Sequence, residues 1–150
     1  MNDYRNILVP VDGSATSTKA LAAALNIARE ANGRVRLVHA VDVLAHLAGF
    51  GASGQVFAIV REAGERVLAE AADLAKAAGV PCESVLFDKP GERLGETMAR
   101  EASTWGADLV VVGTHGRRGV QRALLGSGAE EIIRLATVPV LVIRHGDGGS

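Results

Sequence analysis

The chain has 150 residues, with 16 lysine and arginine residues against 17 aspartate and glutamate residues and a formal net charge of -1. This length predicts a single domain spanning 1–150, and 48% hydrophobic and 22% charged residues are typical of a globular protein. Near-neutral charge and 3% aromatic content argue against nucleic-acid and membrane-surface partners. The one cysteine excludes an intramolecular disulfide, and no apolar run approaches the ~20 residues of a spanning helix, so we expect a cytoplasmic protein.

The first half of the chain alternates short apolar runs with a helical stripe. A first strand is expected at 7–11, and it ends at the turn Asp12-Gly13-Ser14. Ser14 or Thr16 is suited to cap the next helix, which ends at Asn32-Gly33. A second strand is expected at 35–41. The connection 42–54 is rich in glycine, and we expect a flexible loop there.

The second half continues the alternation. It predicts a helix at about 55–78, a more polar strand at 82–87, a helix at 93–104 and an apolar strand at 109–112. After a loop at 113–125, a helix at 127–136 and a last strand at 138–143 are expected, with a frayed tail at 145–150. Five strands alternating with four helices predict an α/β fold: a doubly wound, open parallel sheet of order 3-2-1-4-5 with helices on both faces.

Two glycine-rich segments are candidates for binding phosphate. The segment 49–54 matches G-x-G-x-x-G, but it does not join a strand directly to its helix, so we interpret it as loop. In the second candidate, Gly113-Thr114-His115-Gly116 is followed after nine residues by Gly126-Ser127. Because Gly113 has no side chain, a ligand could approach the backbone at the end of the strand. The backbone amides at the N-terminus of the next helix favour binding of phosphate. Alternatively, these glycines only make turns and Ser127 only caps the helix.

This spacing and three longer segments resemble the universal stress protein family, in its ATP-binding branch. The segments are ILVPVDGS, VHAVD and VVVGTHGRRGVQRALLGSGAEEIIRLATVPVLVIR, which together span nearly the whole chain. The family pattern G-2x-G-9x-G-[ST] is matched at every position, by Gly113, Gly116, Gly126 and Ser127. The resemblance implies a fold like the adenine nucleotide alpha hydrolases and a bound ATP, ADP or AMP, accompanied by Mg²⁺.

The resemblance also implies a set of binding residues. Adenine would pack near Pro10, Val11, Asp12 and Ala40. Ribose and phosphates would lie along Val112, Gly113, Thr114, His115, Gly116, Arg117 and Arg118, and along Gly126, Ser127 and Gly128. Asp12 is suited to accept a hydrogen bond from adenine or ribose, or to help hold a hydrated Mg²⁺. Its other interpretation is a turn carboxylate that bonds the amide of Gly13 or Ser14, and the two roles are compatible.

Function is interpreted as regulatory rather than catalytic. The glycine loop offers no evident general base, so we expect at most slow ATP hydrolysis and predict no catalytic residue. The four histidines lack metal-ligand spacing, and no protein metal site is predicted. The alternatives are an enzyme that uses the same adenine site, for hydrolysis or nucleotidyl transfer, and a nucleotide-free interaction module. The apolar edge strand 138–143 predicts a homodimer, which the resemblance also implies.

Overall fold

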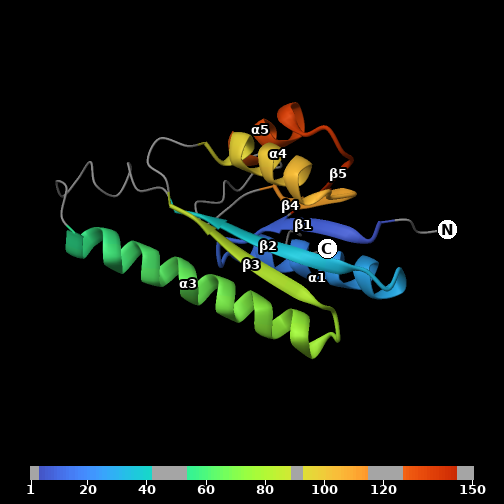
Figure 1. Cartoon of the computed structure of the whole chain (residues 1–150), viewed down its shortest axis with the longest axis horizontal. Coiled ribbons are helices and arrows are strands. Elements are labelled where there is room, and N and C mark those ends of the chain that lie inside the picture. Colours follow the sequence, from blue (N-terminus) through green and yellow to red (C-terminus); the bar gives the residue numbers. More distant parts are fainter. Residues whose placement is uncertain (1–3, 42–53, 89–92, 115–126, 145–150) are drawn as a thin grey trace.

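Five parallel strands form one sheet in the order β3-β2-β1-β4-β5, as the sequence predicts. The computed structural model describes residues 4–41, 54–88, 93–114 and 127–144. The strands are β1 (Asn6–Pro10), β2 (Arg34–Ala40), β3 (Cys82–Phe87), β4 (Leu109–Gly113) and β5 (Val140–Ile143). Helices α1 (Ala15–Glu30) and α3 (Gly54–Ala77) cover one face, and α4 (Leu94–Trp105) and α5 (Ser127–Leu135) cover the other (Figure 1). The predicted fold class is therefore confirmed.

The start of β5 and the start of α3 differ from their predicted positions. β5 begins at Val140, not at 138, because Pro139 has no amide hydrogen to donate to the sheet. The Pro139 carbonyl still accepts a hydrogen bond from the Val110 amide at 3.0 Å. Gly54 belongs to α3 rather than to the predicted loop. The rest of that loop, 42–53, and the predicted frayed tail, 145–150, lie outside the described residues.

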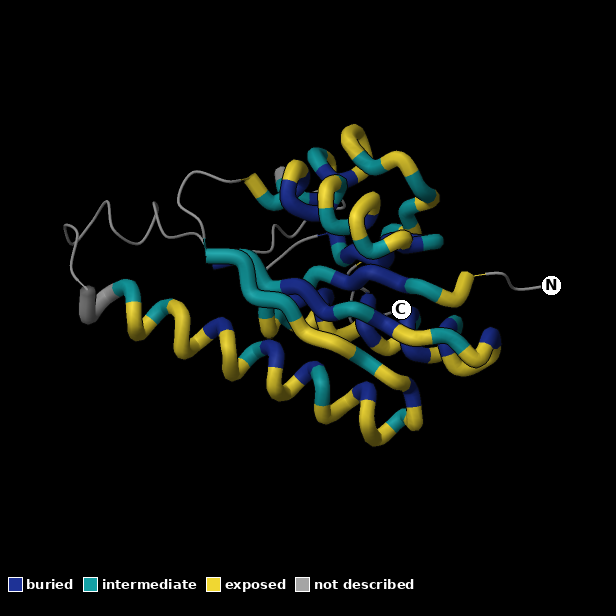
Figure 2. The backbone as a smooth tube through the Cα atoms, viewed as in Figure 1, coloured by how far each residue is buried: buried dark blue, intermediate teal, exposed yellow. Residues whose placement is uncertain are grey.

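Each face of the sheet carries its own apolar core. The middle residues of central strand β1 are buried, as they must be in a parallel strand between two helical layers (Figure 2). Its side chains alternate between the cores, because Ile7 and Val9 belong to one cluster and Leu8 belongs to the other. The core under α1 and α3 includes Ile7, Val9, Leu21, Val35, Leu37, Leu68 and Val111. The core under α4 and α5 includes Leu8, Val38, Met98, Ala102, Val110 and Ile132.

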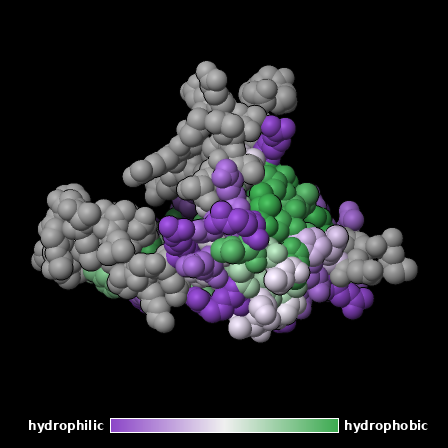
Figure 3. Space-filling model, turned by 90° about the horizontal axis from the view of Figure 1, so that it is seen from above, coloured by the Kyte–Doolittle hydropathy of each residue, from purple (hydrophilic) through white to green (hydrophobic). Residues whose placement is uncertain are grey.

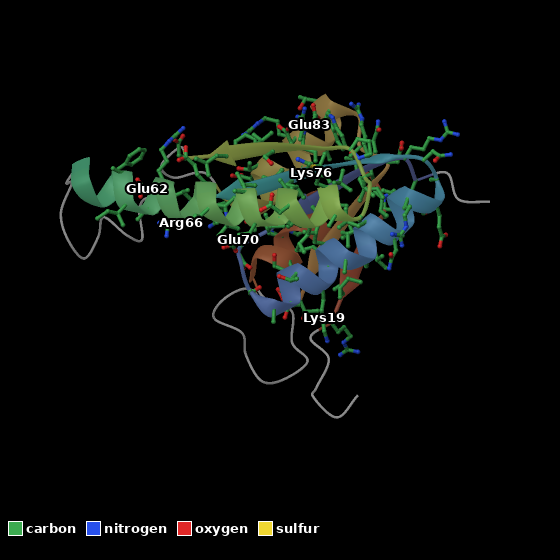
Figure 4. The ribbon with its side chains drawn as sticks, turned by 90° about the horizontal axis from the view of Figure 1, so that it is seen from below. Lys19, Glu62, Arg66, Glu70, Lys76 and Glu83 are labelled. Carbon is green, nitrogen blue, oxygen red and sulfur yellow. The ribbon has the colours of Figure 1, made fainter. Side chains whose placement is uncertain are left out.

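The outer surface of α3 is mostly polar, although Ile59 and Leu74 are also exposed on this helix. Glu62, Arg66, Glu70 and Lys76 are exposed along it (Figure 4). Glu62 and Arg66 lie one helical turn apart and form an ion pair at 3.9 Å. Because both side chains are exposed to solvent, the pair contributes little to stability. None of the helices in the described ranges is long and apolar enough to cross a membrane.

Candidate functional site

The sheet changes its winding direction between β1 and β4. These strands are neighbours and run parallel, yet α1 follows β1 on one face while α5 follows β4 on the other (Figure 1). The connections leaving two such strands diverge, and this divergence makes the carboxyl edge at that point the usual ligand site of doubly wound sheets. The predicted binding residues that the structure describes at the ends of β1, β2 and β4 lie at this edge.

The turn between β1 and α1 is held by short polar side chains. The Asp12 amide donates to Ser17 Oγ at 3.1 Å, and Asp12 Oδ1 accepts from the Ser14 amide at 2.9 Å. Ser14 is also the cap of α1, because its hydroxyl accepts from the Ser17 amide at 3.1 Å. Ser14, and not Thr16, is thus the capping residue. The turn-carboxylate interpretation of Asp12 is confirmed with Ser14 as partner, and this bond uses one of the two carboxylate oxygens.

The end of β4 packs closely against the start of α1. A Cβ atom placed on Gly113 would lie 2.6 Å from Thr16 Cγ2 and 3.1 Å from the Thr16 carbonyl oxygen. The space left by the missing side chain of Gly113 is therefore occupied by the first turn of α1, although the glycine at this strand end predicted that a ligand would approach there. The next residue, Thr114, is buried, and its amide donates to the Ile143 carbonyl at 2.9 Å. The end of β4 is consequently held between the first turn of α1 and strand β5.

The start of α5 is anchored on α4 rather than on the sheet alone. A Cβ atom on Gly128 would lie 3.1 Å from Leu94 Cδ2, so the first turn of α5 sits close to the first turn of α4. Three residues later, Glu131 Oε1 accepts a hydrogen bond from the Gly95 amide at 2.9 Å. The helix start at which the resemblance places phosphate is thus fixed by contacts to a neighbouring helix.

The structure brings together the predicted residues that it describes. Pro10, Val11 and Asp12 lie at the end of β1, Ala40 ends β2, and Val112, Gly113 and Thr114 end β4, so all of them occupy the carboxyl edge of three adjacent strands. Ser127 and Gly128 open α5. Five further predicted residues lie outside the described ranges: His115, Gly116, Arg117, Arg118 and Gly126.

Sequence reasoning missed three residues that shape this edge. Ser17 accepts a hydrogen bond from the Asp12 amide, and Thr16, which the sequence suggested only as a helix cap, packs against Gly113. The run Ala15-Thr16-Ser17-Thr18 of small, hydroxyl-rich residues was the available signal. The third is His39, whose Nδ1 lies 2.8 Å from the Val11 carbonyl oxygen. A lone histidine within a strand gives no sequence signal for such a contact.

Metal-binding and nucleophilic alternatives receive no support from the described part of the chain. Nowhere in those ranges do three histidine, cysteine, aspartate or glutamate side chains gather as metal ligands. The Cys82 thiol packs against the core under α3, and burial raises its pKa, so it is less reactive than an ordinary cysteine.

Comparison with known proteins identifies similar chains along almost the whole length. The model of the universal stress protein family matches residues 3–144. A universal stress protein of Methanocaldococcus jannaschii is 34% identical over 147 residues, covering 95% of this chain and 84% of the relative. A crystal structure of a universal stress protein family member from Burkholderia pseudomallei is 35% identical, with a TM-score of 0.74 and coverage of 93% and 96%. A universal stress protein crystallised in complex with cAMP is 27% identical, with a TM-score of 0.68 and coverage of 94% and 97%.

Proposed function

This chain belongs to the universal stress protein family, and we propose that it binds an adenine nucleotide at the carboxyl edge of its sheet, between β1 and β4. The observation that carries the proposal is the convergence of the Asp12 turn and the Gly113–Thr114 strand end at the point where the winding reverses. The similar protein crystallised with cAMP supports an adenine nucleotide as the ligand class.

The proposed binding mode assigns one part of the nucleotide to each strand end. Adenine packs against the apolar residues Pro10, Val11 and Ala40, and Asp12 accepts from adenine or ribose. The phosphates extend toward the glycine loop and the start of α5, where free amides and the helix dipole favour negative charge. We propose ATP with Mg²⁺ as the physiological form, because a carboxylate such as that of Asp12 is a suitable ligand for a hydrated Mg²⁺.

We propose a regulatory role with at most slow ATP hydrolysis. Asp12 Oδ1 already accepts a hydrogen bond from the Ser14 amide, so this oxygen is occupied within the turn and is poorly placed to accept a proton from an attacking water. Turnover should therefore lie far below the ~1–100 s⁻¹ of kinases. Phosphate release at saturating Mg-ATP measures it, and rapid turnover would favour the alternative of an adenine-nucleotide-using enzyme. We also propose that the chain works in the cytoplasm, where adenine nucleotides are abundant, as a homodimer joined along β5.

Two measurements test nucleotide binding directly. Mass spectrometry of the small molecules released from the purified, denatured protein identifies a retained nucleotide. Calorimetric titration with ATP, ADP, AMP and cAMP, each with and without Mg²⁺, then ranks the ligands. The proposal is wrong if no nucleotide is released and none of the four binds.

A variant pair assigns the site. Asp12→Asn keeps an oxygen for the Ser14 amide but removes the charge, and we expect Mg-ATP affinity to fall about tenfold. Asp73→Asn is the matched control, because Asp73 is exposed on α3, away from the carboxyl edge, and its loss should leave affinity unchanged. Equal affinities of the two variants would remove Asp12 from the site.

A further inference from the structure

Val11, the first residue after β1, is bonded to β2 through both its amide and its carbonyl group. Its amide donates to the Val38 carbonyl at 2.8 Å, which continues the backbone ladder by one residue. Its carbonyl oxygen lies 2.8 Å from Nδ1 of His39, so a side chain supplies the next bond. Because a carbonyl oxygen only accepts hydrogen bonds, Nδ1 carries the proton and donates it. The peptide that joins Val11 to Asp12 is therefore fixed by an imidazole.

The imidazole of His39 is itself held in place by α3. A Cβ atom on Gly64, a buried residue of α3, would lie 2.6 Å from His39 Cδ2 and 3.1 Å from His39 Nε2. The ring thus occupies a notch that only glycine leaves open, and the notch restricts where Nδ1 points. Helix α3 touches the same turn a second time, because a Cβ atom on Gly13 would lie 3.3 Å from Val67 Cγ2.

We propose that His39 is a positioning residue of the nucleotide site and that the Gly64 notch aims it. The bond from Nδ1 fixes the Val11 carbonyl and so sets the direction in which Asp12 leaves β1. The inference rests on the nucleotide site proposed above and deepens it, since it names a residue that pre-orders that site without touching the nucleotide. A site ordered before the ligand arrives binds more tightly, because less conformational freedom is lost on binding.

The first test separates a positioning role from simple packing. His39→Leu keeps apolar bulk but removes the donor, and we expect Mg-ATP affinity to fall about tenfold. His39→Asn returns an N–H group one bond beyond Cγ, as Nδ1 is, and should restore affinity to near the wild-type value. Urea unfolding of both variants measures stability separately. If His39→Leu loses stability but binds Mg-ATP as the wild type does, His39 is only a packing residue and the proposal is wrong.

The second test uses Gly64, and it tests the positioning role of His39 even if His39→Leu does not fold. Gly64→Ala pushes a methyl group into the ring, so affinity should drop about fivefold while the ring is present. In His39→Ala the ring is gone, and of the close contacts only Leu86 Cδ1, at 3.0 Å from the added methyl carbon, remains, so adding Gly64→Ala should cost much less affinity than it does with the ring present. Additive losses of affinity in the double variant would contradict the notch.

A third measurement needs no nucleotide and so separates this inference from the proposed function. In the nucleotide-free protein, hydrogen exchange at the amides of Asp12 and Ser14 should accelerate in His39→Leu and stay slow in His39→Asn. Unchanged exchange in His39→Leu overturns the positioning role even if the wild type binds nucleotide. Accelerated exchange with no nucleotide binding by the wild type supports the positioning role and rejects the proposed function alone.

Discussion

Glu131 of α5 supplies the cap that the sequence around the start of α4 does not provide. Arg93 occupies the capping position of α4, and its side chain makes no capping hydrogen bond. Instead, Glu131 Oε1 accepts from the Gly95 amide at 2.9 Å, and Glu131 Oε2 pairs with Arg93 at 3.1 Å. A largely buried carboxylate at a helix start also interacts favourably with the helix dipole. One side chain therefore stabilises α4 and fixes α5 beside it.

Loss of the Glu131 charge should destabilise the fold measurably. Glu131→Gln weakens both the Gly95 bond and the Arg93 pair, and we expect about 1–2 kcal/mol less free energy of unfolding in urea. Glu70→Gln on the exposed face of α3 is the control, with an expected change within about 0.5 kcal/mol (Figure 4). Similar losses in both variants would show that Glu131 is not a cap.

The pair between Arg36 and Glu83 should make stability depend on pH. Arg36 of β2 donates to Glu83 Oε1 of β3 at 2.8 Å and also pairs with Glu101 of α4. The hydrogen bond from Arg36 lowers the pKa of Glu83 below its ordinary value of about 4.3, so the folded state binds fewer protons than the unfolded one near that pH. This stabilisation is present above the ordinary pKa and is lost as pH falls through the folded pKa.

A comparison at two pH values tests this linkage. The free energy of unfolding of the wild type should exceed that of Glu83→Gln at pH 7, and the difference should shrink below pH 4. Because the Glu83 side chain is 45% exposed, the difference is small and should also shrink in high salt. A difference that grows on acidification would contradict the assignment.

At the scale of elements, local sequence patterns predict most of the helices and strands, but they do not predict the contacts between those elements. Strand β3 lies at its predicted limits, because its polar edge pattern is a property of six consecutive residues. The Val11–His39 bond depends instead on the register that pairs Pro10 with Val38, and no local pattern encodes a register between strands 28 residues apart. The Glu131–Gly95 cap depends in the same way on how two helices pack.

The contact between β4 and α1 should tolerate no side chain at residue 113. Gly113→Ala places a methyl group 2.6 Å from Thr16 Cγ2, so the strand end or the helix must shift, and we expect about 1–3 kcal/mol lower stability and weaker Mg-ATP binding. Thr16→Ser removes Cγ2 but keeps the hydroxyl. The double variant should therefore recover part of the loss, as measured by urea unfolding and calorimetry. No recovery would mean that the clash is with backbone alone.

At the scale of the whole molecule, the two edges of the sheet differ in character. Strand β3 exposes Glu83 and Ser84, which discourage pairing with another sheet. Strand β5 carries only apolar residues, and Leu141 is 37% exposed on it. On α5, Ile133 and Leu135 are also exposed, and the view from the α4 and α5 side shows an apolar region on this surface (Figure 3). Within the described residues no strand lies beyond β5, and an apolar edge of this kind favours association along β5.

We expect the homodimer to form by antiparallel pairing of β5 across a two-fold axis, which satisfies the open backbone groups of both copies. Val142 packs against the core under α4 and α5, so a charge there would damage the fold. Leu141→Glu places a charge on the exposed position instead and should convert the dimer to a folded monomer in sedimentation. Ser84→Glu, on the opposite edge strand, is the matched control and should remain dimeric. A wild type that sediments as a monomer at high micromolar concentration would rule the dimer out, and dissociation of Ser84→Glu would move the interface to β3.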